Sequence, residues 1–370
     1  MKYDYLIVGA GLFGATFACL AKKAGKTCLI IDQRNHVGGN LYCEERYGII
    51  VHKYGPHIFH TNHKVVYDFV TSLVEVSAYS HQPMARYKDE LYNLPFNMNT
   101  FHQMWGVTTP EEAKEIIKEQ SEHIRYNGTL EEKAISMVGI DIYQKLIKEY
   151  TEKQWGVECR NLPAFIIKRI PVRFTYDNRY FNDQYQFIPK KGYNHLFTRL
   201  LEGITVLKGV PFEQIKGTWR SKANKLLFTG RIDSLFDYKY GELPYRSLHF
   251  VHDCKHTDNY QGCAVMNYTS HDVSYTRSIE HRFFEETLQQ PSDKTIVTFE
   301  YPNGLAGRDS DKAFYPINTW ESEDLLNKYK SELKSHKDIL VGGRLGNYRY
   351  YDMDDTILSA MKLAKEELNI

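Results

Sequence analysis

The fold is decided by Tyr5-Leu6-Ile7-Val8-Gly9-Ala10-Gly11-Leu12-Phe13-Gly14, where a strand-like run (3–8) enters a G-x-G-x-x-G turn. An Ala-rich stretch at 14–24 and a second strand-like run at 27–32 follow. In such a βαβ unit, the glycines permit a tight turn, close approach of a pyrophosphate and close packing of helix on strand. The order predicts a Rossmann-like dinucleotide-binding unit with the phosphates at the helix N-terminus.

Asp32 lies 32 − 14 = 18 residues after Gly14, where a carboxylate accepts hydrogen bonds from ribose hydroxyls. Arg34 and a second glycine turn, Gly38-Gly39-Asn40, come next. This pattern resembles the FAD-binding start of the large family that contains the amine oxidases. Gly342-Gly343-Arg344, near the other end of the chain, fits the late strand–helix turn that meets the flavin in that family. The FAD domain is therefore expected to be discontinuous.

Composition excludes several classes of protein. The 370 residues allow two or three domains, and the net charge of +1 favours neither nucleic-acid binding nor a polybasic membrane surface. No segment reaches the roughly twenty apolar residues that span a bilayer, and no signal peptide is recognisable. The six cysteines lack C-x-x-C or metal spacing. We expect a cytoplasmic protein with reduced cysteines, no bound metal, no membrane span and no nucleic-acid partner.

Local signals predict further elements. Two capping boxes, at 109–112 and 129–132, start a helical block. Strand-like runs at 262–268, 273–277 and 295–301 predict an antiparallel sheet. The short apolar run 226–230 is typical of a buried parallel strand, and 357–368 has helical spacing with Asp354 or Asp355 as its cap.

The predicted fold class is α/β, a discontinuous Rossmann-like FAD-binding domain with a small helical subdomain and an antiparallel β-sheet subdomain. The FAD-binding domain is expected to comprise 1–78, 190–240 and 310–370, and the helical subdomain 100–165. The sheet or substrate subdomain is expected to comprise 79–99, 166–189 and 241–309, with a mobile loop near 160–175.

Five long motifs narrow the family. They are Tyr54-Gly55-Pro56-His57-Ile58-Phe59-His60, Tyr150-Thr151-Glu152-Lys153-Gln154-Trp155-Gly156, Lys168-Arg169-Ile170-Pro171-Val172-Arg173-Phe174, Gly262-Cys263-Ala264-Val265-Met266-Asn267-Tyr268 and Arg344-Leu345-Gly346-Asn347-Tyr348-Arg349-Tyr350-Tyr351-Asp352-Met353-Asp354. Together they closely resemble the bacterial UDP-galactopyranose mutases, and the resemblance runs in order from residue 3 to about residue 368.

The resemblance implies an isomerase that interconverts UDP-galactopyranose and UDP-galactofuranose on reduced FAD with no net oxidation. Flavin N5 would attack the anomeric carbon as UDP leaves, and the sugar would open and reclose through its other hydroxyl before UDP returns. The family also implies that the galactofuranose serves cell-surface polysaccharide synthesis. An external reductant, NAD(P)H or a reductase, and a homodimer are expected as partners.

The same resemblance implies roles for individual residues. Catalysis is assigned to Arg169 and Arg277, the two phosphate-binding arginines, and to His60 near the flavin. Substrate binding is assigned to His81, Leu146, Tyr150, Thr151, Trp155, Arg169, Tyr180, Asn267, Arg277, Tyr315 and Tyr350. Cofactor binding is assigned to Gly9, Gly11, Leu12, Phe13, Gly14, Asp32, Gln33, Arg34, Gly39, Asn40, His57, Ile58, Phe212, Arg344, Tyr350, Tyr351, Asp352 and Met353.

Three residues depart from the pattern of relatives. His81 stands where some bacterial members carry Asn, Leu146 replaces an aromatic residue of some members, and Glu149 occupies a position that is Gly in others. A Glu149 carboxylate in the cleft would repel a diphosphate, so we expect it to face solvent.

Two other readings remain open at this point. An FAD-dependent oxidoreductase of the amine-oxidase-like family would share the nucleotide-binding motifs but would have no use for two diphosphate-binding arginines. A nonenzymatic FAD-binding regulator would bind the cofactor without turning over a sugar nucleotide.

Overall fold

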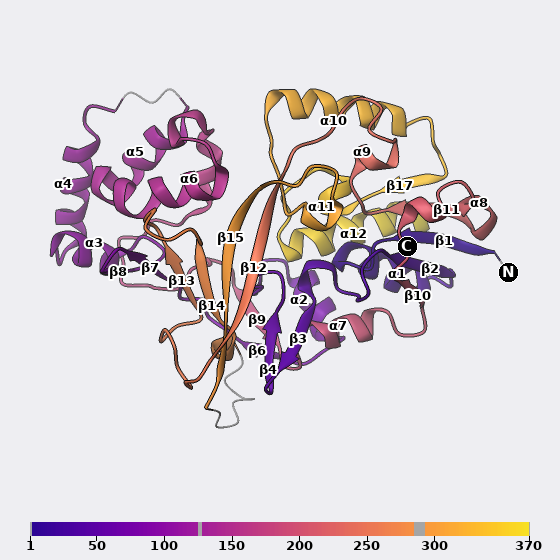
Figure 1. The fold of residues 1–370 in the computed structure, drawn as a ribbon, viewed down its shortest axis with the longest axis horizontal. Coiled ribbons are helices and arrows are strands. Elements are labelled where there is room, and N and C mark those ends of the chain that lie inside the picture. Colours follow the sequence, from indigo (N-terminus) through magenta and orange to yellow (C-terminus); the bar gives the residue numbers. More distant parts are fainter. Residues whose placement is uncertain (1, 125–127, 285–292, 370) are drawn as a thin grey trace.

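The computed structural model describes residues 2–124, 128–284 and 293–369. A helical lobe lies at one end, a long sheet occupies the middle, and an α/β lobe that contains both ends of the chain lies at the other end (Figure 1). The nucleotide-binding unit is thus separated from the helical lobe by the sheet.

A five-stranded parallel sheet forms the centre of the α/β lobe. Its strand order is β10 (Thr205–Lys208), β2 (Cys28–Asp32), β1 (Tyr3–Val8), β11 (Ala223–Phe228) and β17 (Ile339–Val341). All four pairings are parallel. The apolar runs predicted this arrangement, because a strand covered on both faces is apolar throughout and every residue of β2 is buried.

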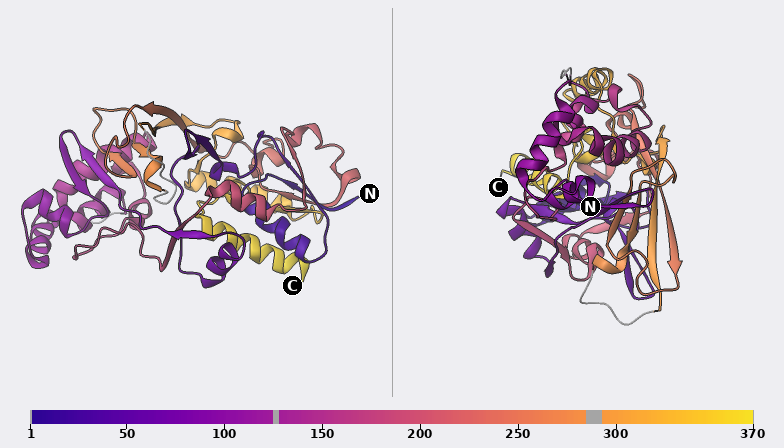
Figure 2. Two further views of the ribbon diagram at one scale, coloured as in Figure 1. Left: turned by 90° about the horizontal axis from the view of Figure 1, so that it is seen from below. Right: turned by 90° about the vertical axis from the view of Figure 1, so that its left-hand side faces the viewer.

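Helices cover both faces of this sheet. α1 (Leu12–Lys23), α7 (Gly192–Leu200) and α12 (Met353–Leu368) share one apolar core with the inward side chains of β1 and β2. Figure 2 shows α12 lying beside α1, although they come from opposite ends of the sequence. A second core on the other face includes α8 (Trp219–Lys222) and the 3-10 turn η5 (Phe212–Gln214). The predicted discontinuous Rossmann-like fold is confirmed.

α12 begins earlier than the sequence pattern predicted. It starts at Met353, and its N-cap residue is Asp352, whose side chain makes no capping hydrogen bond. Asp354 and Asp355 therefore lie inside the first turn, so the prediction that one of them caps the helix was wrong. Between β17 and α12 lies one short helical turn, α11 (Gly343–Gly346).

The central sheet has seven strands. Their order is β16 (Tyr315–Pro316), β12 (Tyr245–Lys255), β15 (Thr295–Leu305), β14 (Arg277–Glu280), β13 (Val265–Tyr268), β7 (Met84–Tyr87) and β8 (Glu90–Asn93). Neighbours pair antiparallel except β13 with β7, which are parallel. The predicted strand at 273–277 was largely wrong, because β14 starts only at Arg277 and the residues before it form a loop.

Two smaller sheets connect the central sheet to the α/β lobe. One is the hairpin of β3 (Cys43–Arg46) with β4 (Ile49–His52), and the other has the order β5 (Phe59–Thr61), β9 (Tyr185–Pro189) and β6 (Val76–Ala78). α2 (Lys64–Thr71) follows β5 and contributes Val66 and Val70 to the main core.

The helical lobe contains α3 (Met98–Trp105), α4 (Pro110–Ser121), α5 (Leu130–Ile142), the π-helical segment η2 (Tyr143–Lys148) and α6 (Glu149–Trp155). Both predicted capping boxes are present: Thr109 Oγ1 accepts from the Glu112 N–H at 3.4 Å and Thr129 Oγ1 from the Glu132 N–H at 3.3 Å. The short turns η3 (Cys159–Asn161) and η4 (Ala164–Arg169) lead back towards the sheet.

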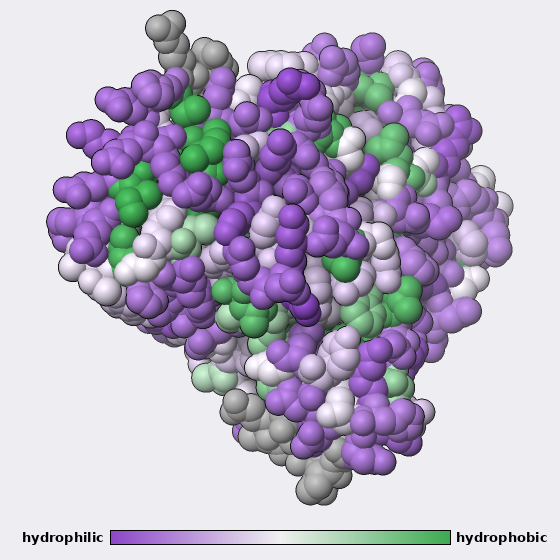
Figure 3. Space-filling view, turned by 60° about the vertical axis from the view of Figure 1, so that its left-hand side comes forward, coloured by the Kyte–Doolittle hydropathy of each residue, from purple (hydrophilic) through white to green (hydrophobic). Residues whose placement is uncertain are grey.

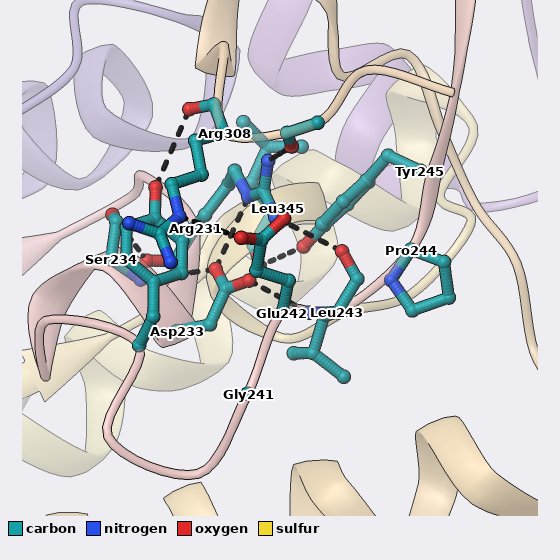
Figure 4. A network of polar contacts seen from close by, with 12 residues as sticks. Arg231, Asp233, Ser234, Gly241, Glu242, Leu243, Pro244, Tyr245, Arg308 and Leu345 are labelled. Carbon is teal, nitrogen blue, oxygen red and sulfur yellow. Dashed lines mark hydrogen bonds and ion pairs between the residues drawn. The ribbon is translucent and has the colours of Figure 1, made fainter. Parts of the chain in front are cut away.

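The guanidinium of a buried ion pair also contacts the loop after β15, which it joins to the α/β lobe (Figure 4). Arg231, before α9 (Ile232–Leu235), pairs with Asp233 at 2.7 Å, and both side chains are fully buried. The guanidinium also donates to the carbonyl oxygens of Leu243 and Gly307. These bonds satisfy the buried charges and fix the loop that leads to η8 (Ser310–Lys312) and on to α10 (Trp320–Leu333).

The face shown in Figure 3 is mainly hydrophilic, with apolar residues in small separate groups. None of the described helices is long and apolar enough to cross a membrane.

Candidate active site

A cavity opens at the carboxyl-terminal edge of the parallel sheet, with an empty volume of about 1310 Å³ when open solvent is included. Segments from both ends of the chain line it. The cavity brings together every predicted cofactor-binding residue except Ile58 and Tyr350, namely Gly9, Gly11, Leu12, Phe13, Gly14, Asp32, Gln33, Arg34, Gly39, Asn40, His57, Phe212, Arg344, Tyr351, Asp352 and Met353.

Glycines shape the floor of this cavity. A Cβ on Gly14 would lie 2.2 Å from the Gly9 carbonyl oxygen, and one on Gly39 would lie 3.2 Å from the Gly11 Cα. The two glycine turns therefore meet backbone to backbone. Between them the N-terminus of α1 has no acidic residue in its first turn and no side-chain cap, so its peptide N–H groups are free to bind an anion.

The next part of the cavity is lined by the Asp32 carboxylate and by an ion pair between Arg34 and Asp311. Asp32 accepts hydrogen bonds from the Ala10 N–H at 2.7 Å and from the Arg34 N–H at 2.8 Å, and its burial raises the pKa of that carboxyl. Arg34 Nε pairs with Asp311 at 2.7 Å, and Gln33 donates to the same carboxylate oxygen at 2.8 Å. The loop fixed by Arg231 is thereby held against the cavity next to Asp32.

His57 also lines the cavity. Its Nδ1 is buried without a hydrogen-bond partner among the described residues, although the residue lines the cavity. Burial lowers the pKa of His57 to about 3, with smaller contributions from His52 and Arg344, so the imidazole is neutral. This nitrogen faces a cavity in which an isoalloxazine edge could offer it a hydrogen bond. The glycine floor, Asp32 and His57 fit FAD.

His57 is also the end of a chain of buried histidines. Its peptide N–H donates to His52 Nδ1 at 3.1 Å, and the His52 N–H donates to His281 Nδ1 at 3.2 Å. Both rings therefore carry their proton on Nε2 if they are neutral. His281 Nε2 then bonds Thr298 Oγ1 at 2.6 Å, which bonds His252 Nδ1 at 2.7 Å. The chain links the cavity to β12 and β15.

Several of the predicted substrate-binding residues form a second group beside the cavity. Arg277 lies near enough to Tyr150 and Tyr315 to affect their pKa values, and the stacked rings of Tyr315 and Tyr350 have centroids 5.6 Å apart. Arg344, which lines the cavity, lies 4.9 Å from the Tyr350 ring. Tyr350 is therefore placed between the two groups rather than in the cofactor cavity.

Arg277 is held by a partner that sequence reasoning missed. Glu300 accepts from its Nε at 3.1 Å and from its Nη2 at 2.7 and 2.8 Å. Burial, the largest single influence, would lower the pKa of Arg277, but the Glu300 carboxylate, with smaller contributions from Tyr150 and Tyr315, raises it well above its usual range. The guanidinium therefore stays charged in a fixed plane. Asn267 lies directly opposite Arg277 on β13 and donates to the Met84 carbonyl at 3.2 Å.

Two of the three predicted histidines, His60 and His81, both lie against the Phe181 ring. His60 Nδ1 bonds Asp183 at 2.6 Å, and its ring stacks on Phe181 with centroids 3.7 Å apart. His81 lies 5.7 Å from Tyr180, and burial, with a smaller contribution from Arg277, lowers its pKa to about 3. A neutral His81 can donate one hydrogen bond and accept one, as the amide of an Asn does.

Other predicted residues are placed differently. Leu146 and Thr151 are buried, and Leu146 packs in the core of the helical lobe, as does part of Trp155. Ile58 is likewise buried, in a small core with Ile188 and Ile279. The Arg169 side chain lies outside the described residues, so its role stays a prediction.

Glu149 contacts a neighbouring loop. Its carboxylate accepts from the His271 N–H at 2.6 Å and so caps the loop between β13 and β14. Arg246 is a further cation that sequence reasoning missed: it lies opposite Tyr315 in the β12–β16 pairing and donates to the Gln154 carbonyl at 3.1 Å. Asp183, Glu300 and Asp311 were missed because their partners are distant in sequence.

A Rossmann-like sheet with a glycine-lined cavity that a C-terminal segment completes defines a flavoprotein of the FAD-binding class. The profile of the UDP-galactopyranose mutases matches residues 145–350, more than half of the chain, and that of NAD(P)-binding Rossmann-like domains matches residues 7–73. The chain belongs to the UDP-galactopyranose mutase family, which confirms the resemblance read from its motifs. It is an enzyme, an isomerase that carries FAD.

Three named relatives are similar in sequence over nearly the whole chain. A probable UDP-galactopyranose mutase of Klebsiella pneumoniae is 39% identical, covering 99% of this chain and 95% of the relative. A dTDP-fucopyranose mutase of Escherichia coli is 37% identical, covering 97% of each. A UDP-galactopyranose mutase of Mycoplasma genitalium is 30% identical, covering 100% of this chain and 95% of the relative.

Solved structures show the same fold. A reduced UDP-galactopyranose mutase superposes with a TM-score of 0.77 at 13% identity, covering 100% of this chain and 96% of its own. A putative protoporphyrinogen oxidase from Exiguobacterium sp. 255-15 superposes with a TM-score of 0.66 at 13% identity, covering 100% and 99%. The fold alone is therefore shared with oxidases, and the sequence relationship decides the family.

Proposed function

We propose that the protein interconverts UDP-galactopyranose and UDP-galactofuranose. Relatives with that name match almost the full chain. The observation that carries the proposal is the position of Arg277, a charged guanidinium held by Glu300 among tyrosines next to the flavin end of the cavity. A leaving nucleoside diphosphate needs a cation held in place where its charge develops.

Different residues of the chain have different roles in the proposed reaction. When bound, reduced FAD supplies an electron-rich ring nitrogen as the nucleophile. Arg277, with Arg169 as its proposed second arginine, binds the diphosphate and stabilises its negative charge. Tyr150, Tyr315 and Tyr350 offer hydroxyls to the same group and exclude water with their rings. We propose that the loop near 160–175 closes over the substrate.

Three histidines complete the proposed site. His57 offers one unpaired nitrogen to the flavin edge, and Asp183 fixes the ring of His60 next to Phe181. Neither His57 nor His81 adds a positive charge that would compete with the arginines for the diphosphate, because the pKa of each is lowered to about 3.

The name of one relative suggests a second candidate substrate, a dTDP-linked fucose. The Escherichia coli protein named dTDP-fucopyranose mutase is 37% identical, close to the 39% of the Klebsiella pneumoniae protein. Because fucose lacks the 6-hydroxyl of galactose and dTDP differs from UDP in base and ribose, one assay with both nucleotide sugars decides between them.

Further parts of the proposal concern partners and location. We propose a homodimer in the cytoplasm, with NAD(P)H or a reductase supplying electrons to the flavin. Sedimentation of the FAD-loaded protein and anaerobic flavin bleaching by NAD(P)H test the two partner statements.

The decisive experiment is an anaerobic conversion assay on oxidised and dithionite-reduced enzyme. UDP-galactofuranose and dTDP-fucofuranose are incubated separately, and the products are separated by chromatography. We expect the reduced enzyme to form UDP-galactopyranose catalytically, without net flavin oxidation. Turnover by the oxidised enzyme alone, or stoichiometric flavin consumption, would support an oxidoreductase instead. Turnover of the fucose derivative alone would reassign the substrate, and no turnover of either sugar would favour a regulator.

A further inference from the structure

Lys153 of α6 is held by backbone alone. Its Nζ donates to four carbonyl oxygens, those of Tyr268 at 2.8 Å, Ser270 at 2.7 Å, Val273 at 3.2 Å and Tyr275 at 3.1 Å. All four belong to the loop between β13 and β14 or to its edges. An ammonium group has three hydrogens, so this one is saturated by the loop.

The loop connects two residues of the proposed substrate site. Asn267 precedes it on β13 and Arg277 follows it on β14, and the two are directly opposite in the strand pairing. Thr276, at the loop's end, also donates its N–H to the Glu300 carbonyl at 2.8 Å. The course of the loop therefore sets where Asn267 and Arg277 stand.

α6 contributes the other side of that site. Tyr150 lies one turn before Lys153 on the same helix; burial raises its pKa to about 12, and Arg277 is near enough to lower it in part. Glu149, on the same turn as Tyr150, caps the loop through the His271 N–H at 2.6 Å. The helix thus holds the loop at two points, of which Lys153 makes the larger number of bonds.

Four converging carbonyl dipoles repel one another unless a cation lies between them. If the ammonium were absent, the loop would have to turn these carbonyls towards water, and the two strands it joins would lose their fixed spacing. The binding-competent arrangement would then be populated for only part of the time, which lowers the apparent affinity for a ligand by that fraction.

We propose that Lys153 is a positioning residue, whose ammonium group clips the β13–β14 loop to α6 and so keeps Arg277 and Asn267 opposite Tyr150 in the arrangement that binds the nucleoside diphosphate. The inference rests on the proposed function, since it assumes that these three residues bind the substrate.

The hydrogen bonds from the Lys153 ammonium group to the β13–β14 loop should depend on pH. Burial lowers the pKa of Lys153 to about 8, and the carboxylates of Glu149 and Asp272 oppose this change. Glu152 and His271, 3.9 Å apart, also face this region. Because these side chains surround the same loop, the Lys153→Arg variant is needed to assign a pH effect to the lysine itself.

The test measures UDP binding by calorimetry on oxidised, FAD-loaded protein, together with amide hydrogen exchange of residues 268–276. Lys153→Met should weaken UDP binding about tenfold, as expected for loss of hydrogen bonds from a charged group, and should speed exchange in that segment. FAD content should not change, because other elements line its cavity. Lys148→Met is the matched control: it removes an exposed charge next to α6 and should bind UDP like the wild type.

A pH series separates positioning from simple loss of packing. Wild-type affinity for UDP should fall as pH rises through about 8, whereas Lys153→Arg, which keeps its charge, should lack that step. A Lys153→Met protein with wild-type UDP affinity, or the same alkaline step in Lys153→Arg, would overturn the inference. The Arg variant decides the matter even if the Met variant does not fold. Failure of the wild type to convert either nucleotide sugar would instead overturn the proposed function.

Discussion

Arg277 and Glu300 stand directly opposite each other on β14 and β15, and the carboxylate accepts three hydrogen bonds from the guanidinium at 2.7 to 3.1 Å. The Glu300 side chain is 1% exposed and that of Arg277 is 22% exposed. The cation that would receive the diphosphate is thus already paired before a ligand arrives. Its role depends on geometry as much as on charge.

Removing Glu300 should destabilise the protein. In Glu300→Ala the guanidinium loses its carboxylate in a largely buried position, which should cost about 2 to 4 kcal/mol of the free energy of unfolding. Urea denaturation of the FAD-loaded protein measures this cost. The control is Asp89→Ala, at a fully exposed carboxylate, which should change stability by less than about 0.5 kcal/mol. Equal effects of both variants would contradict the structural role given to Glu300.

Loss of either proposed phosphate-binding arginine should abolish most turnover while FAD stays bound. One charged donor that acts in the transition state is commonly worth about 2 to 4 kcal/mol, so Arg277→Ala and Arg169→Ala should each lower kcat by roughly a hundredfold or more. Steady-state rates of the reduced enzyme and the flavin absorbance of the purified protein check both statements. Near-normal rates in one variant would remove that arginine from the catalytic set.

Gly14→Ala should prevent FAD binding. The new Cβ would lie 2.2 Å from the Gly9 carbonyl oxygen, so β1 and α1 would have to separate where the pyrophosphate binds. Flavin absorbance per protein after purification in excess FAD is the measurement. Gly217→Ala serves as the control, because a Cβ there meets nothing within 4 Å. Full flavin content in Gly14→Ala would contradict the assigned role of this turn.

The buried histidine chain predicts a loss of stability in acid. Burial lowers the pKa of His52 and of His252 to about 4, below the ordinary value near 6.5 that an unfolded chain has. Folding therefore favours the neutral rings. Their contribution is complete above about pH 6.5 and is lost as pH falls towards 4. Urea unfolding at about pH 7 and about pH 5 should show the difference.

The variant His52→Asn isolates part of this effect. Its amide oxygen can accept the His57 N–H as Nδ1 does, but it does not titrate. It should be less stable than the wild type at about pH 7, because the stacking on Phe284 is lost, yet it should lose less stability on acidification. An equal acid loss in both proteins would show that His52 is not responsible.

Short-range patterns predicted much of the fold. The first βαβ unit and the helix starts at Thr109 and Thr129 depend on residues within a few positions of one another, so the sequence displays them directly. Most of the residues that the family motifs assign to the cofactor line one cavity, and those motifs are equally short, so the sequence displays them directly. Ile58 was an exception, since its motif contributes His57 to the cavity while Ile58 itself faces a separate core.

Long-range partners account for the rest. Residues 273–276 are rich in residues that favour strands, but the Val273 and Tyr275 carbonyls bond Lys153 instead of a neighbouring strand. Tertiary contacts of this kind override the local propensity for strands, and that propensity alone does not predict them. Glu300 could have been suggested as a cross-strand partner of Arg277, yet only the pairing of β14 with β15 shows that they are opposite.

The parallel sheet contains strands from both ends of the chain, and this has a consequence for folding during synthesis. β17 pairs with β11, Tyr5 donates to Glu367 at 2.8 Å, and Met353 lines the same cavity as Gly9. A nascent chain on the ribosome can form the first glycine turn early, but the pocket lacks a wall until residues 339–368 have been synthesised. Cofactor capture is therefore a step that follows translation of that segment, and a cell short of flavin would accumulate chains that are fully made but not yet loaded.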